Sequence, residues 1–146
     1  MRSATYQHAQ RGTLIVVWML VMSAAFVAIG LIFVRPLLIT VPLLLLSGWL
    51  FHSLTIEIDE RALRWRFGPG LIRKSVLLNE IVSTQAVRTK FIEGWGIHLS
   101  RFGWLYNVSG RDAVAITMKN GKRFALGTDE PEMLINAIRR ASAQPC

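Results

Sequence analysis

The feature that most constrains this chain is a long, almost uncharged stretch near its start. Between residues 13 and 54 the only formal charge is Arg35, and Pro36 follows it directly. A helix needs roughly 20 mainly apolar residues to cross the hydrocarbon core of a bilayer. The stretch therefore predicts two membrane helices, Thr13–Val34 and Leu37–Ser53, folded back on each other at this charged turn, since proline suits a helix start.

Two details decide how these segments are expected to sit in a membrane. The first apolar segment exceeds the roughly 7–15 residues of a signal-peptide core, and no small-residue cleavage site follows it, so we expect an uncleaved anchor. The second segment is shorter and contains Pro42, which removes a backbone hydrogen bond inside a helix. We expect it either to cross fully with a kink or to bend at Pro42 as a tilted, re-entrant segment.

Charge and tryptophan positions predict the orientation of the hairpin. Arg2 and Arg11 precede the first segment, whereas Arg35 alone lies between the segments. Five basic residues follow soon after the second segment: Arg61, Arg64, Arg66, Arg73 and Lys74. Because positive charge favours the cytoplasmic side, both ends are expected in the cytoplasm. Trp18 and Trp49 would then anchor the hairpin at the same membrane interface.

The rest of the chain has the composition of a soluble domain. All nine acidic residues lie after residue 54, and the whole chain has a net charge of +8. No dense Lys/Arg run or recognised nucleic-acid module accompanies this charge, so a nucleic-acid partner is not expected. The single cysteine, Cys146, cannot form an internal disulfide or a cysteine-based metal site. We therefore expect an N-terminal cytoplasmic tail (1–12), a two-span hairpin (13–53) and one domain (54–146).

Apolar and polar residues alternate after the hairpin with the period of two that is typical of strands. Leu54–Asp59 and Leu63–Phe67 are the first two such runs. Leu71–Leu78 and Ile81–Phe91 are expected to be two more strands. The domain is therefore predicted to begin directly at the membrane, with almost no linker.

The end of the chain predicts a hairpin and a closing helix. Val114–Met118 and Lys122–Leu126 flank Asn120-Gly121, a pair typical of tight turns in which both residues take positive φ. An amphipathic helix is expected after Asp129, whose side chain can cap it. About seven short strands and one helix, without βαβ alternation, predict a small antiparallel barrel or sandwich capped by the helix.

Four short glycine-containing segments accompany this order of elements: Phe67-Gly68-Pro69-Gly70, Glu93-Gly94-Trp95-Gly96-Ile97, Tyr106-Asn107-Val108-Ser109-Gly110 and Gly127-Thr128-Asp129-Glu130-Pro131. With the hairpin, they resemble the bacterial membrane-anchored pleckstrin-homology (PH) domain proteins, a small inner-membrane family. The resemblance implies a membrane α-hairpin followed by a mainly-β PH-like barrel of about seven antiparallel strands and a C-terminal α-helix. It implies a setting at the bacterial inner membrane but no particular reaction or ligand.

No motif in the sequence points to catalysis. His8, His52 and His98 lack the spacing of metal ligands, and no nucleophile elbow, phosphate loop or dinucleotide-binding motif occurs. The acidic pairs Asp59-Glu60 and Asp129-Glu130 are better explained as a turn and a helix cap than as acid–base pairs. Neither an enzyme nor a cofactor is expected.

Two groups of residues are candidates for an interaction surface. The first is a basic group suited to anionic lipid: Arg64, Arg66, Arg73 and Lys74. Phosphoinositide-binding PH domains generally place several basic residues along and between the first two strands, but here the acids nearly cancel the bases, so a specific inositol-phosphate site is not expected. The residues concerned are Arg61, Arg64 and Arg66 beside Glu57, Asp59 and Glu60. The second is an aromatic and basic group suited to lipid headgroups or a protein partner: Arg101, Phe102, Trp104 and Tyr106. The alternative is that this segment is strand core, with Trp95, Ile97 and Leu99 in one strand, Leu105 or Tyr106 in the next, and glycines at bulges and turns.

These observations predict a non-enzymatic protein that scaffolds or regulates a protein partner, or its own homo-oligomer, at the cytoplasmic face of the membrane. The tether would supply a high local concentration. The alternative is a module that binds anionic lipid or a small anion. A membrane-bound enzyme is a third hypothesis, and it would need a polar cluster that no motif here indicates.

Overall fold

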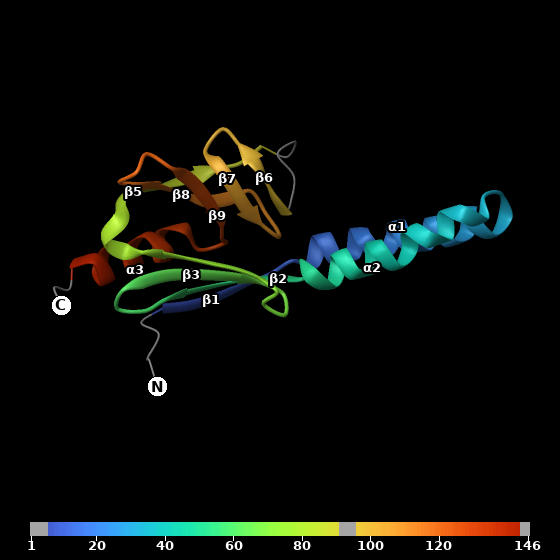
Figure 1. The fold of residues 1–146 in the computed structure, drawn as a ribbon, viewed down its shortest axis with the longest axis horizontal. Coiled ribbons are helices and arrows are strands. Elements are labelled where there is room, and N and C mark those ends of the chain that lie inside the picture. The colour runs from blue at the N-terminus through green and yellow to red at the C-terminus, as the bar shows by residue number, and fades with distance from the viewer. Residues whose placement is uncertain (1–5, 91–95, 144–146) are drawn as a thin grey trace.

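The computed structural model of the chain describes residues 6–90 and 96–143. A helical hairpin extends from one end of a domain made of two β-sheets (Figure 1). The helices are α1 (Thr13–Ile32), the 3₁₀ helix η1 (Arg35–Ile39), α2 (Thr40–Leu50), the 3₁₀ helix η2 (Leu78–Glu80) and α3 (Pro131–Ala143). The strands are β1 (Tyr6–Arg11), β2 (Ser53–Ile58), β3 (Ala62–Phe67), β4 (Ile72–Leu77), β5 (Ile81–Arg88), β6 (Gly96–Ser100), β7 (Gly103–Asn107), β8 (Asp112–Met118) and β9 (Arg123–Gly127).

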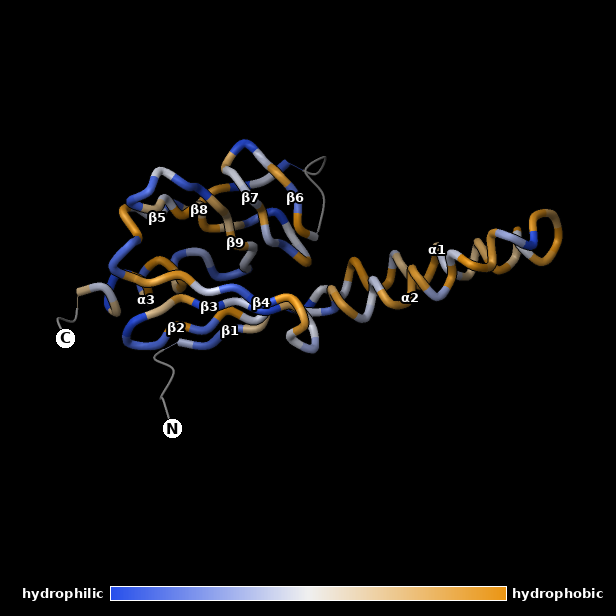
Figure 2. The backbone as a smooth tube through the Cα atoms, in the orientation of Figure 1, coloured by the Kyte–Doolittle hydropathy of each residue, from blue (hydrophilic) through white to orange (hydrophobic). Residues whose placement is uncertain are grey.

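Helix α1 is long and apolar enough to cross a membrane. It has a mean hydropathy of 2.7, and only 17% of its most apolar stretch is buried within the protein. The second arm, residues 35–50, is also apolar but shorter. The hairpin is hydrophobic along most of its length, whereas the domain is mixed (Figure 2). Such a surface is unfavourable in water, so it needs a covering of lipid or protein.

The second arm is helical from the tip of the hairpin to the domain. Pro42 lies in the first turn of α2, where its missing N–H would have no acceptor within the helix. Ile39 and Thr40, at the change from η1 to α2, both have right-handed helical backbone angles. The two arms run side by side (Figure 1), so of the two alternatives for this segment the bend at Pro42 does not occur.

Small residues set the distance between the two arms. A Cβ atom added to Gly48 would lie 3.3 Å from the Cβ atom of Met19, and one added to Gly30 would lie 2.8 Å from Leu38. Ser23 is buried, and its hydroxyl donates to the carbonyl oxygen of Met19 at 2.7 Å. Packing of this kind is typical of helix pairs in membranes.

Residues 6–11 form a strand, so the expected N-terminal tail is wrong for this part of the chain. Strand β1 pairs antiparallel with β2, from Tyr6 opposite Ile58 to Arg11 opposite Ser53. The residues of β1 that face the inner side of the sheet are Tyr6, His8 and Gln10. Because all three carry polar groups, the alternation that marks a half-buried strand is hidden in the sequence.

The nine strands form two sheets rather than one seven-stranded barrel. Sheet A has the order β1-β2-β3-β4, and sheet B has the order β5-β8-β9-β7-β6. All strand pairs are antiparallel except β7 and β9, which are parallel. Helix α3 lies at the end of the domain away from the hairpin, between the two sheets (Figure 1). The expected apolar helix, mainly antiparallel strands and C-terminal helix are therefore confirmed.

An aromatic cluster fills the core between the sheets. The Trp65 ring stacks on Phe124 at 5.0 Å between centroids and meets Tyr106 edge-on at 5.3 Å. Phe51, the residue after α2, meets Phe67 edge-on at 5.3 Å. The second arm of the hairpin is therefore tied directly into the core.

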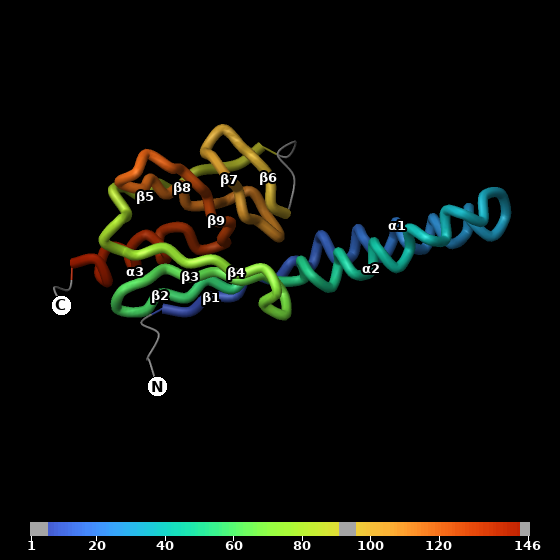
Figure 3. Tube along the Cα trace, viewed as in Figure 1, coloured from blue at the N-terminus to red at the C-terminus, as the bar shows by residue number. Residues whose placement is uncertain are grey.

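The two arms of the hairpin continue into neighbouring strands of sheet A. Gly12 alone separates β1 from α1, and its N–H donates to the carbonyl oxygen of His52 at 2.7 Å. A side chain at Gly12 would lie 2.6 Å from the carbonyl oxygen of Phe51. The N–H of Gly68 donates to the carbonyl oxygen of Ser53 at 2.9 Å, which holds the β3–β4 turn against the same junction (Figure 3).

The turn between β8 and β9 has a different geometry from the one that the sequence predicted. Gly121 has φ of 80°, but no non-glycine residue in the described part of the chain has positive φ, so Asn120 does not. The N–H of Gly121 donates to the carbonyl oxygen of Met118 at 3.0 Å. The turn is therefore a longer type of hairpin, with a single glycine in the left-handed region.

Strand β1 also contacts the start of α3. His8 Nε2 lies 2.6 Å from Asp129 Oδ1, and His8 Nδ1 lies 3.5 Å from Glu130 Oε2. The Tyr6 hydroxyl is buried with no hydrogen-bond partner among the described residues. Burial, followed by the negative charges of Glu130 and Asp129, raises the pKa of Tyr6 to about 12.

The junction predicts that two glycines of one turn respond differently to alanine. Gly68 has φ of 44°, and a Cβ atom there would lie 2.5 Å from the carbonyl oxygen of Leu50; Gly70 has φ of 93°, but its nearest neighbour would be 3.8 Å away. We expect Gly70→Ala to lower the free energy of unfolding by about 1 kcal/mol through φ strain alone. Gly68→Ala should cost about 2 kcal/mol more, because backbone must move.

Unfolding of the full-length protein in detergent, followed by circular dichroism, measures this difference between the two alanine variants. Equal losses in the two variants would contradict the close packing of the turn against α2.

A second prediction concerns alkaline pH. Because the pKa of Tyr6 is raised, the unfolded chain releases this proton at about pH 10 while the folded protein keeps it to about pH 12. The contribution of Tyr6 to stability is therefore complete below pH 10 and is lost across this window. We expect the difference in phenolate absorbance between wild type and Tyr6→Phe to titrate near pH 12. A difference titration near pH 10 would show that Tyr6 is not buried beside these acids.

Candidate functional site

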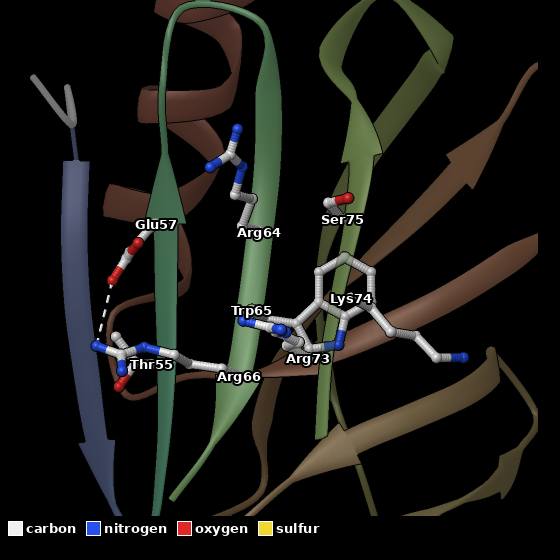
Figure 4. Close-up of a pocket in the computed structure, with 8 residues that line it drawn as sticks. All are labelled: Thr55, Glu57, Arg64, Trp65, Arg66, Arg73, Lys74 and Ser75. Atoms are coloured by element: carbon white, nitrogen blue, oxygen red, sulfur yellow. Dashed lines mark hydrogen bonds and ion pairs between the residues drawn. The ribbon is translucent and has the colours of Figure 1, made fainter. Parts of the chain in front are cut away.

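The candidate site is a hollow on the outer face of sheet A. It has a volume of about 440 Å³ (Figure 4). Its lining comes from β2, β3 and β4: Thr55, Glu57, Arg64, Trp65, Arg66, Arg73, Lys74 and Ser75. Three of these residues are arginines that the sequence analysis placed in the basic group.

Strand register explains why the arginines gather on one face. Arg66 lies opposite Thr55 on β2 and opposite Arg73 on β4, which makes one row across the sheet. Residues two positions along a strand share a face, so Arg64 points to the same side in the next row. The three arginines therefore share the outer face, which faces away from the core.

The arginines differ in how well they are neutralised. Arg64 Nη2 lies 2.9 Å from Asp59 Oδ2, whereas Arg66 Nη2 lies 3.5 Å from Glu57 Oε1. Within residues 6–90 and 96–143, no ion pair involves Arg73. Because Arg66 and Arg73 are directly opposite each other, their like charges disfavour the pairing of β3 and β4. An anion bound between them would relieve this repulsion.

Lys74 does not point outward with the arginines. It lies opposite Trp65, whose side chain is in the core, and its Nζ atom lies 5.4 Å from the centroid of the Tyr106 ring. A cation over an aromatic face is attracted by the ring. The basic group from the sequence is therefore divided, because neighbouring residues of a strand face opposite sides.

The second candidate group lies on the β6–β7 hairpin of sheet B. Arg101 Nη2 donates to the carbonyl oxygen of Arg88 at 2.8 Å, and its guanidinium lies 4.6 Å from the Phe102 ring centroid. Phe102 is partly buried against a small cluster that includes Leu105. Arg101 and Phe102 therefore stabilise their own part of sheet B.

The exposed apolar surface of this hairpin is a pair of residues that face each other across the two strands. Trp104 is 52% exposed, and its partner in the register, Leu99, is 72% exposed. Tyr106 is only 3% exposed and belongs to the aromatic core, so its prediction as a surface residue is wrong. Leu99 was considered only as a strand-core residue, and its exposure shows that this assignment is wrong.

The residues that predicted topology lie at opposite ends of the hairpin. Trp18 is in the second turn of α1 and Trp49 is in the last turn of α2, so both lie near the domain. Both indoles are about half exposed. Arg35 and Pro36 begin η1 at the far tip. The end of β1 carries Arg11, which is exposed at the junction; Arg2 lies outside the described residues.

The histidines are separate from the basic hollow. His8 contacts the acids before α3, and His52 Nδ1 lies 2.6 Å from the carbonyl oxygen of Trp49. His98 Nε2 is buried with no hydrogen-bond partner among the described residues. Across residues 6–90 and 96–143, no three His, Cys, Asp or Glu side chains are placed to hold a metal ion.

The arrangement offers two kinds of chemistry on two different sheets. Sheet A presents guanidinium groups suited to phosphate or carboxylate, and sheet B presents an apolar pair suited to docking. Lys74 and Tyr106 bring the two candidate groups into contact, at 5.4 Å; the outward arginines of sheet A and the exposed pair of sheet B lie on different sheets. Comparison of the chain with models of known protein families finds no match, and comparison with curated proteins finds no similar sequence.

Proposed function

We propose that this chain is a non-enzymatic, membrane-anchored platform that holds a PH-like domain against the cytoplasmic face of the bacterial inner membrane. There it scaffolds or regulates a protein partner or a second copy of itself. The mainly antiparallel strands of the described residues, with a C-terminal helix at one end of the domain, support the PH-like assignment. The resemblance of the sequence to membrane-anchored PH-domain proteins also supports this assignment.

The observation that carries this proposal is the direct passage of both membrane arms into adjacent strands. Gly12 is the single residue between β1 and α1, and Phe51 and His52 are the two residues between α2 and β2. A flexible linker would let the domain sample many orientations. This junction instead fixes the height and direction of the domain, as a platform requires.

The pair Leu99 and Trp104 supplies a surface for the partner. Exposed apolar pairs of this kind are unfavourable in water, and tryptophan is enriched at the centres of protein interfaces. Both residues lie on sheet B, which the hairpin does not enter. The partner would therefore approach the domain without displacing the membrane anchor.

A second candidate function is recognition of an anionic group by the basic hollow of sheet A. Arg73, which has no ion pair within residues 6–90 and 96–143 and lies opposite Arg66, favours this function. The two functions are compatible, because they use different sheets.

Thiol labelling tests the proposed topology. In a Cys146→Ser background, we expect a membrane-impermeant thiol reagent added to intact cells to label Arg35→Cys but not Lys119→Cys. The positive-inside distribution of arginines predicts this result. Lysed cells provide the control, in which Lys119→Cys should react. Labelling of Lys119→Cys in intact cells would reverse the proposed orientation.

Substitution of the apolar pair tests the platform function. We expect wild-type protein from native membranes to co-purify with a stoichiometric partner or as a defined oligomer. The double variant Leu99→Asn/Trp104→Asn should weaken this association at least tenfold, since buried tryptophans often contribute more than 2 kcal/mol to an interface. Met133→Asn, at an exposed apolar residue of α3, is the matched control and should keep the partner.

Mass photometry of the purified material measures the assembly. Monodisperse, partner-free monomers from wild-type membranes would count against a platform, and equal loss in the control would show that the apolar pair has no special role.

A further inference from the structure

The part of sheet A nearest the hairpin combines basic and apolar groups. Arg11 ends β1 at the junction, and Arg66 and Arg73 form the neighbouring row on the same outer face. Leu71, in the turn before β4, is 73% exposed. We call these four residues the junction face.

Strand geometry gives the height of each arginine above the junction. Arg66 lies opposite Thr55, two residues beyond the row of Arg11 and Ser53. At roughly 3.3 Å per residue this is about 7 Å along the strand. Each headgroup layer of a bilayer is about 5–8 Å thick, so Arg11, Arg66 and Arg73 lie at headgroup depth when α1 fills the hydrocarbon core. Arg64, in the next row, lies about 13 Å beyond the junction and outside this layer.

The charges of the junction face are suited to phosphodiester groups. Arg66 has only a long contact to Glu57, at 3.5 Å, and no ion pair within the described chain involves Arg73. Arg66 and Arg73 are directly opposite each other in the register of β3 and β4, so both side chains can donate hydrogen bonds to one phosphate bound over these strands. Arg64 already has a short ion pair with Asp59, at 2.9 Å, so it is the least available of the three outward arginines of the hollow.

Leu71 adds an apolar contact at the same level. Its turn is held to the base of the hairpin, since the N–H of Gly68 donates to the carbonyl oxygen of Ser53 and Gly68 packs under the end of α2. In water the exposed Leu71 side chain gains nothing, whereas in the acyl boundary of a bilayer its apolar area is removed from water. The turn lies beside the hairpin in the views of the whole chain (Figure 3).

We propose that the junction face binds the headgroups of anionic phospholipids in the bilayer that the hairpin crosses. Arg66 and Arg73 hold a phosphodiester group between β3 and β4, Arg11 attracts a second one, and Leu71 enters the acyl boundary. The inference rests on the proposed membrane crossing. The partner is a lipid and not a free anion, because the site is an open face at headgroup depth that includes an apolar side chain.

Native mass spectrometry of the full-length protein, extracted from equal amounts of phosphatidylglycerol and phosphatidylcholine, tests the arginines. We expect wild type to retain phosphatidylglycerol preferentially. Each arginine near an anionic surface contributes about a five-fold preference, so Arg66→Gln/Arg73→Gln should lose most of the enrichment. Arg139→Gln/Arg140→Gln removes the same charge from exposed positions of α3, at the far end of the domain, and should keep it.

Two results of this measurement would overturn the proposal. One is unchanged enrichment in Arg66→Gln/Arg73→Gln, and the other is equal loss in the α3 control. Competition by inorganic phosphate as effective as that by phosphatidylglycerol would assign the site to a small anion, which also overturns the lipid assignment.

Fluorescence from the turn tests Leu71 independently. In a Cys146→Ser background, an environment-sensitive dye on Leu71→Cys should shift to the blue in vesicles and be quenched by lipids with a quencher high on the acyl chain. The same dye on Lys119→Cys should stay aqueous. An aqueous dye at position 71 would overturn the proposal. Flotation after alkaline extraction reports the membrane crossing separately, so failure of the proposed function is distinguishable from failure of the lipid site.

Discussion

The structure depends on one backbone hydrogen bond between two adjacent connections, from the N–H of Gly12 to the carbonyl oxygen of His52. It closes the gap between the helical hairpin and the strand pair β1–β2, so that two antiparallel helices continue as two antiparallel strands. A hydrogen bond in such a low-dielectric junction is strong, and an unpaired group there would be costly. The glycine is needed because a larger residue would collide with the carbonyl oxygen of Phe51.

Because the helices continue directly into the strands, the position of a residue along a strand of sheet A sets its distance from the end of the hairpin. Each row of sheet A lies at a fixed height above the end of the hairpin, and alternate residues of a row belong to opposite faces. The outer face therefore arranges arginines in order of distance from the proposed membrane, whereas the inner face carries the aromatic core. Sheet B receives neither arm of the hairpin, and it carries the exposed pair of Leu99 and Trp104, the proposed docking surface. The two sheets therefore have different proposed surfaces because the arms of the hairpin enter only sheet A.

Local patterns in the sequence predicted the hairpin arms, strands β2 to β5 and helix α3, because hydrophobic period and breaking residues act over a few positions. The pairing of strands that are distant in the sequence could not be predicted from such local patterns. The parallel pairing of β7 and β9 joins strands whose order no local signal sets. Lys74 was grouped with the outward arginines, and buried Tyr106 was placed on the surface, because alternation does not say which face is inner for a short polar run. The basic hollow was anticipated through Arg64, Arg66 and Arg73, but their unequal pairing depends on the turn that holds Asp59.

The position of β1 also sets an order of synthesis. This strand leaves the ribosome before the hairpin, yet its neighbour β2 appears only after the whole hairpin has been made. Until then β1 is an unpaired edge, which is a risk for aggregation when a strand is apolar. Its inner residues Tyr6, His8 and Gln10 make it a poor template for such pairing. The polar character that hid β1 from the sequence pattern thus suits a strand that is made before the hairpin and paired only after it.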